Sequence, residues 1–129
     1  MATHEITIEN FESTIDQNSI VFMDFWAEWC GPCKMFGPIF DSVSEKNPDI
    51  VFGKCNTDEQ GELAGHLQIM SIPTLMIFKD QILIFRQAGA LPEEALNEII
   101  TKVRELDMDE VRKSIAEAEA QEGKTEEPD

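Results

Sequence analysis

Apolar runs of strand length alternate along the chain with segments of helical periodicity. Residues 6–8 alternate apolar and polar positions, and residues 20–26 form an almost unbroken apolar run, which is typical of a strand buried on both faces. Residues 50–55, 74–78 and 82–85 are further apolar runs of this length. We therefore expect five strands, with the strand at residues 20–26 in the centre of the sheet.

Helices are predicted between most of these strands. From Pro32 onward an apolar stripe recurs at helical spacing, formed by Met35, Phe36, Ile39, Phe40 and Val43. Pro38 lies inside this stripe, so we expect a kink there and not the end of the helix. A weaker helix is expected around residues 63–67. Another helix begins at Pro92, with a buried stripe of Ala95, Leu96, Ile99, Ile100 and Val103.

The last two strands are close enough for an antiparallel hairpin. Only residues 79–81 separate them, although no glycine is present to supply the usual positive φ. The resulting order of elements is β-α-β-α-β-α-β-β-α. This order predicts a layered α/β fold in which crossover helices pack on both sides of a mixed sheet.

The C-terminal part of the chain has a different character. We expect the main domain to span residues 1–106, an acidic amphipathic helix to cover residues 107–120, and residues 121–129 to be disordered. Residues 105–129 contain ten acidic and three basic side chains. Two interpretations stay open: a solvated acidic extension, or a docked helix that modifies the choice of partner.

Length and charge narrow the possible functions. The 129 residues suit one compact domain, and the net charge of −16 would repel nucleic acid and anionic membranes. The first ten residues lack the basic and apolar regions of a secretion signal, and no apolar segment is long enough to span a membrane. We therefore expect a cytoplasmic protein without nucleic-acid or membrane partners.

Cys30 and Cys33 stand where the buried strand meets the following helix. A helix N-terminus stabilises a thiolate, so Cys30 is the expected nucleophile and Cys33, one turn deeper, the more shielded resolving thiol. Half of a zinc site or a static disulfide would be the alternatives. A zinc site would need two further ligands, and the remaining soft candidates, Cys55, His4 and His66, show no second paired spacing.

Asp24 and Cys55 are two further candidate functional residues. Asp24 interrupts an apolar strand, where an ionised carboxylate is costly to bury unless it is paired or protonated. Asp24 therefore either occupies an exposed or edge position or has a functional role. Cys55 lies at a strand end and is expected to be a small buried hydrophobe, with a regulatory thiol as the alternative.

These residues together are similar to those of the thioredoxin family. The resemblance is carried by residues 21–35, with Asp24 and the Cys-Gly-Pro-Cys sequence, and extends over roughly residues 4–106. It includes Pro38, Lys54, Gly89 and the Ser-Ile-Pro-Thr sequence at residues 71–74.

The resemblance implies a thioredoxin fold, with a central mixed five-stranded sheet flanked by four helices and with Pro73 as a cis-proline beside the disulfide. It also implies that Asp24, with Lys54 nearby, handles the proton of Cys33; burial should raise the pKa of Asp24 and Lys54 should lower it. The implied patch for substrate binding surrounds the cysteines and comprises Trp29, Gly31, Pro32, Ile72, Pro73 and Gly89.

The implied activity is reduction of protein disulfides. Cys30 would attack the disulfide of a client protein and Cys33 would resolve the mixed disulfide. Electrons would return from NADPH through a thioredoxin reductase, with no bound cofactor in this chain other than its own reversible disulfide, and the expected state is a monomer. The alternative is a binding or holdase module of the same fold, in which the acidic tail determines the partner.

Overall fold

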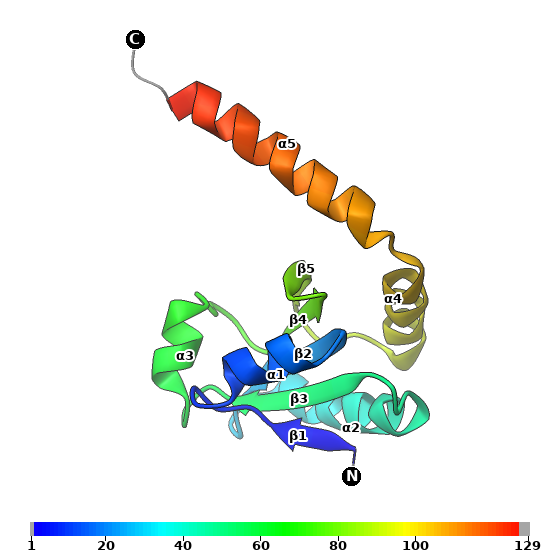
Figure 1. Cartoon of the computed structure of the whole chain (residues 1–129). Helices are drawn as coiled ribbons and strands as arrows, with labels where there is room; N and C mark the ends of the chain where they lie inside the picture. The colour runs from blue at the N-terminus through cyan, green and yellow to red at the C-terminus, as the bar shows by residue number, and fades with distance from the viewer. Residues whose placement is uncertain (1, 127–129) are drawn as a thin grey trace.

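The computed structural model describes the backbone of residues 2–126 and the side chains of residues 2–122. Five strands and five helices follow one another in these residues (Figure 1). In chain order they are β1 (Thr3–Glu5), α1 (Phe11–Gln17), β2 (Ile20–Trp26), α2 (Gly31–Lys46), β3 (Val51–Asn56), α3 (Gly61–His66), β4 (Thr74–Lys79), β5 (Ile82–Ala88), α4 (Glu93–Glu105) and α5 (Met108–Glu126).

The five strands form one mixed sheet in the order β1-β3-β2-β4-β5. β3 runs parallel to both β1 and β2, whereas β4 is antiparallel to β2 and β5. The predicted position of β2 at the centre is confirmed. Its continuous apolar sequence follows from this position, because both of its faces are covered and residues Val21–Phe25 are buried.

Alternate residues of the strands face two separate cores. One core contains Phe22 and Phe52 of the sheet, packed against Phe36 of α2 and Leu96 of α4. The other contains Val21, Met23, Phe25 and Cys55, packed against Ile15 of α1 and Leu63 of α3. The predicted layers are therefore confirmed, with α2 and α4 on one face of the sheet and α1 and α3 on the other.

The first strand was predicted three residues too late in the sequence. β1 is Thr3–Glu5, whereas residues 6–8 lead into the turn before α1. The Thr7 N–H donates to Asn10 Oδ1 at 2.8 Å, which bends the chain away from the sheet. Ile6 stays buried, but Ile8 is 43% exposed. The apolar alternation of residues 6–8 thus reflects one buried side chain and a turn.

The hairpin without glycine forms as predicted. Asp80 and Gln81 both adopt positive φ, at 51° and 71°, which is the backbone of a two-residue turn that matches the twist of β4 and β5. The Asp80 N–H also donates to the Ser19 carbonyl at 2.8 Å. This tertiary contact helps to hold non-glycine residues in a conformation that glycine usually supplies.

The C-terminal helix extends away from the rest of the molecule (Figure 1). Its first turn is attached to the domain, because Met108 is buried and Arg112 pairs with Asp80 at 3.2 Å. α5 continues past the predicted limit at residue 120, as far as Glu126. Residues 127–129 of the predicted disordered tail lie outside the described residues, and the domain boundary at residue 106 stays a prediction. No helix in residues 2–126 is long and apolar enough to cross a membrane.

Candidate active site

Cys30 is the N-cap of α2. Its φ and ψ of −86° and 113° are extended, and its Sγ accepts a hydrogen bond from the Cys33 N–H at 3.2 Å. Pro32 follows in the first turn, where its missing N–H costs nothing. The free N–H groups and the dipole at this end of the helix favour negative charge on sulfur. The local sequence therefore produces a site that activates a thiol.

The two cysteine sulfurs are joined as a disulfide, with the Cα atoms 5.2 Å apart. Cys30 is 4% exposed and Cys33 is 5% exposed. The two side chains are equally buried in this disulfide form, so the expectation that Cys33 is the more shielded stays a prediction. The carbonyl oxygen of Ile72 lies 3.6 Å from Cys30 Sγ, and Cys33 lines a cleft.

The loop that covers Cys30 is fixed at several points. The Ile72–Pro73 peptide is cis, as the family resemblance implied. The Pro73 carbonyl accepts a hydrogen bond from the Gly89 N–H at 2.8 Å, which brings Gly89 next to Pro73. Arg86 of β5 donates to the carbonyl oxygens of Leu67 and Gln68 at the start of the loop. Nothing in the sequence indicated this use of Arg86.

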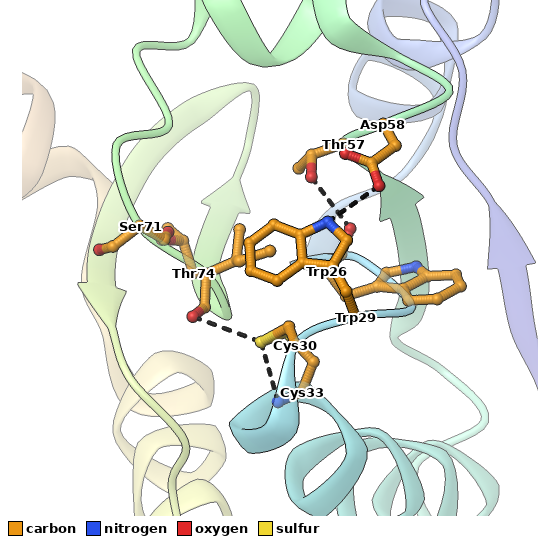
Figure 2. Close-up of a disulfide and its surroundings, with 9 residues drawn as sticks. Trp26, Trp29, Cys30, Cys33, Thr57, Asp58, Ser71 and Thr74 are labelled. Atoms are coloured by element: carbon orange, nitrogen blue, oxygen red, sulfur yellow. Dashed lines mark hydrogen bonds between the residues drawn. A yellow bond between two sulfur atoms is a disulfide. The ribbon is translucent and has the colours of Figure 1, made fainter.

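Trp29 lies beside the disulfide and is 69% exposed. Its indole N–H donates to Asp58 Oδ2 at 3.0 Å (Figure 2). Gly31 and Pro32 are exposed as well. Sequence analysis missed Asp58, because the polar turn after β3 carries several equivalent side chains and only the tertiary structure shows which one faces Trp29.

Asp24 lies in β2 and is completely buried. Neither of its carboxylate oxygens has a hydrogen-bond partner among the described residues. Burial raises its pKa to about 7, Lys54 opposes this increase, and Asp41 adds to it. The exposed or edge position considered for Asp24 is therefore wrong, and the predicted opposition between burial and Lys54 is confirmed.

Lys54 stands opposite Asp24 in the register of β2 and β3. Its Nζ lies 3.3 Å from Asp41 Oδ1 in α2 and 5.8 Å from the ring centre of Trp26. These groups form one wall of an open cleft of about 480 Å³, which we call the Cys33 cleft. It is lined by Trp26, Ala27, Glu28, Cys33, Lys34, Gly37, Pro38, Asp41 and Lys54.

Asp41 is another residue that sequence analysis missed. It lies eight residues after Cys33 in the same helix, with Gly37 midway between them, and residues at i, i+4 and i+8 share a helix face. This spacing could have indicated it. The structure adds that the shared face looks into the Cys33 cleft.

The other candidate residues do not line the Cys33 cleft. Cys55 is a free thiol, fully buried in the core on the α1 and α3 face, as expected of a small hydrophobe. Burial, with a smaller contribution from Asp24, raises its pKa to about 11. His4 and His66 are exposed. Among the side chains of residues 2–122, no group of three or more His, Cys, Asp or Glu is arranged to hold a metal ion.

Comparison with known proteins agrees with this geometry. The thioredoxin family model matches residues 2–102. The chain is 57% identical over 122 residues to thioredoxin 2 of Streptomyces coelicolor, a match that covers 95% of this chain and 91% of the relative. It is 38% identical to the thioredoxin of Bacillus subtilis, over 79% of this chain and 98% of that one. A solved thioredoxin of Plasmodium falciparum superposes with a TM-score of 0.72 at 36% identity, and the match covers 78% of this chain and 98% of that structure.

A mixed sheet of this order, with a Cys-x-x-Cys disulfide at the start of α2, defines a thiol-disulfide oxidoreductase. The activity of this class is the reduction of disulfide bonds in protein substrates. The chain belongs to the thioredoxin family.

Proposed function

We propose that this chain reduces client proteins through Cys30 and Cys33 in two steps. The Cys30 thiolate attacks a client disulfide, that S–S bond breaks, and a mixed disulfide forms while the first client sulfur leaves as a thiolate. Cys33 then attacks Cys30 Sγ and releases the second client sulfur. Two electrons pass from the chain to the client. The observation that carries this proposal is the position of Cys30 Sγ at the N-terminus of α2, 3.2 Å from the Cys33 N–H.

We assign to Asp24 the role of accepting the proton of the Cys33 thiol in the second step. A carboxyl group with a pKa of about 7 is half ionised at neutral pH, which suits a group that must both accept and return a proton. The Cys33 cleft is large enough to admit water. Asp24 does not line this cleft, and it is assigned the proton through a water molecule that bridges from the cleft. We assign to Lys54 the role of tuning the pKa of Asp24, because its positive charge lowers that pKa.

The client-binding patch is assigned to the surface around Cys30. Trp29 is exposed there, and the carbonyl oxygen of Ile72 borders Cys30 on the other side, next to the buried Pro73. An extended client segment would pair with the backbone at Ile72, as an added strand does at a sheet edge. Few charges interrupt this patch, which suits clients of varied sequence. It consists of Trp29, Gly31, Pro32, Ile72, Pro73 and Gly89.

We assign the supply of electrons to NADPH, through a thioredoxin reductase. We also assign the chain to the cytoplasm and expect it to act as a monomer. The family membership supports this assignment, because a dithiol that reduces its clients ends as a disulfide and must be reduced again before the next reaction. The reversible disulfide of Cys30 and Cys33 is then the redox group of the chain.

The test is insulin disulfide reduction with NADPH and a bacterial thioredoxin reductase. We expect the wild type to reduce insulin much faster than free dithiothreitol does, and Cys30→Ser to abolish the reaction. Cys33→Ser should still attack once and should accumulate as the mixed disulfide, which mass spectrometry detects. A Cys30 thiol that titrates at or above the range of an ordinary cysteine would contradict the proposal.

A further inference from the structure

The partner of Lys54 differs from the one that the strand register suggests. Lys54 and Asp24 face each other across β3 and β2, so an ion pair between them would be the simplest arrangement. Lys54 Nζ instead lies 3.3 Å from Asp41 Oδ1, and both of these side chains are about one quarter exposed, at 26% and 27%. Within the described chain, Asp24 is left without a hydrogen-bond partner.

Two further residues lie beside the ammonium at the cleft wall. The Trp26 ring centre is 5.8 Å from Nζ, within the range of a cation–π interaction. A Cβ at Gly37 would stand at the ordinary van der Waals distance of 3.5 Å from Nζ, so α2 passes directly beside the ammonium. Of the groups around the ammonium, Asp41 is the one whose carboxylate makes a direct contact with it, at 3.3 Å.

We propose that Asp41 is a positioning residue for the resolving step: its carboxylate holds the Lys54 ammonium at the wall of the Cys33 cleft, and the Asp24 carboxylate is thereby left unpaired and able to take the proton of Cys33. The inference rests on the proposed function, in which Asp24 accepts this proton. The proton passes from Cys33 Sγ to a carboxylate oxygen of Asp24. The Cys33 sulfur then bonds to Cys30 Sγ, and the bond from Cys30 to the client breaks.

Electrostatics explains why the position of Lys54 matters. An ammonium group that moves next to a carboxylate stabilises the charged form, lowers its pKa and makes it a weaker base. The ionisable groups that interact with Asp24 are Lys54 and Cys55 of β3 and Asp41 of α2, whereas its neighbour in β4 is Leu75. If Asp41 lost its charge, Lys54 would lose the contact that holds it away from Asp24, the residue opposite it in the strand register.

The experiment compares Asp41→Asn with the wild type. The titration of the Asp24 carboxyl is followed by ¹³C NMR, and the resolving step is followed by stopped-flow with a preformed mixed disulfide between Cys30 and a short reporter peptide. We expect Asp41→Asn to move the midpoint of the resolving step toward lower pH by about one unit, the smaller end of the effect of a nearby opposite charge. At pH 8, where Asp24 is ionised in both proteins, the rate should fall about threefold.

Matched variants separate positioning from the direct effect of the Asp41 charge. In a Lys54→Met background no ammonium is present that could move toward Asp24. Asp41→Asn should therefore shift the pH midpoint of the resolving step by less than half of its shift in the presence of Lys54. Asp41→Glu retains the carboxylate and should restore the wild-type profile. An equal shift in both backgrounds would overturn the proposal, and so would an unchanged midpoint in Asp41→Asn with Lys54 present.

Asp24→Asn distinguishes a failure of this inference from a failure of the proposed function. If Asp24→Asn resolves the mixed disulfide at the wild-type rate and with the wild-type pH profile, Asp24 is not the base and the proposed function is wrong at that step. If Asp24→Asn is slow but Asp41→Asn is not, only the role of Asp41 is wrong. A partly exposed ion pair adds little to stability, so Asp41→Asn is expected to fold, which thermal unfolding checks.

Discussion

The indole N–H of Trp29 and the carboxylate of Asp58 are joined by a hydrogen bond of 3.0 Å across the edge of the active site. Trp29 is 69% exposed, so this contact is the restraint that the structure shows on the free end of the indole. Trp29 also borders the disulfide from the residue directly before Cys30. Asp58 therefore restrains the orientation of the exposed Trp29 ring beside the disulfide.

Replacement of Asp58 by Ala should release the indole. A hydrogen bond at such a position contributes about 1 kcal/mol, which corresponds to about a fivefold fall in kcat/KM for insulin. Tryptophan fluorescence anisotropy should fall in parallel. Asp58→Ala in a Trp29→Phe background provides the control, because phenylalanine has no N–H to restrain. An equal loss of activity in that background would show that Asp58 acts by another route.

The Asp24 carboxyl predicts an unusual dependence of stability on pH. Its pKa rises from 3.8 to about 7 on folding, so between these values the native state holds a proton that the unfolded state has lost. The contribution of Asp24 to stability is therefore present below about pH 4, decreases as the pH rises, and is lost above about pH 7. Acidification from pH 8 to pH 5 should stabilise this part of the protein.

Asp24→Asn should remove that dependence. The difference between 3.8 and about 7 corresponds to about 4 kcal/mol, and an unpaired buried amide cancels about 1–3 kcal/mol of this gain. We expect the variant to be more stable than the wild type at pH 8 and to differ less at pH 4. Urea unfolding of both proteins at the two pH values measures the effect. A variant less stable than the wild type at pH 8 would contradict the argument.

Cys55 is predicted to be unreactive and dispensable for activity. It is fully buried, and its pKa of about 11 leaves very little thiolate at neutral pH. Iodoacetamide should therefore label Cys55 in urea but not in the native protein, as mass spectrometry can establish. Native labelling at the rate of an ordinary thiol would support the regulatory alternative.

Two substitutions of Cys55 should separate packing from chemistry. Cys55→Ala should retain the insulin activity and lose about 1 kcal/mol of stability through a small cavity. Cys55→Ser should lose about 1–3 kcal/mol, since its hydroxyl would be buried among the apolar side chains of this core. Loss of activity in both variants, at unchanged stability, would show a chemical role for this thiol.

Removal of residues 107–129 tests whether the C-terminal helix takes part in the reaction. α5 contacts the domain near its first turn, through buried Met108 and the pair of Arg112 with Asp80, and the active site lies on other elements. We expect an insulin reduction rate close to that of the full chain and a loss of about 2 kcal/mol of stability from the lost Met108 contact. Met108→Ala in the full chain should reproduce the stability loss. A large fall in rate in the truncated chain alone would favour the binding-module interpretation, in which the tail determines the partner.

Local patterns were sufficient to predict most of the elements. The limits of β2, β4 and α4 agree with the apolar runs within a few residues, because each of these segments buries one or both faces and so keeps a regular period. β1 was misplaced because a single buried residue, Ile6, followed by a turn gives the same alternation as a short strand. Short patterns of this kind do not distinguish the two structures.

From the sequence alone one can predict the fold class, the reactive cysteine pair and the acid in the central strand, since these depend on periodicity and on the position of Cys30 at the start of a helix. The contacts around them exist only in the folded chain: Ile72 lies against Cys30, Asp58 holds Trp29, and Asp41 is the partner of Lys54. These contacts join residues that are distant in the chain, or that share a helix face only after α2 has packed on the sheet. Their geometry depends on how the layers meet, which no local pattern of side chains specifies.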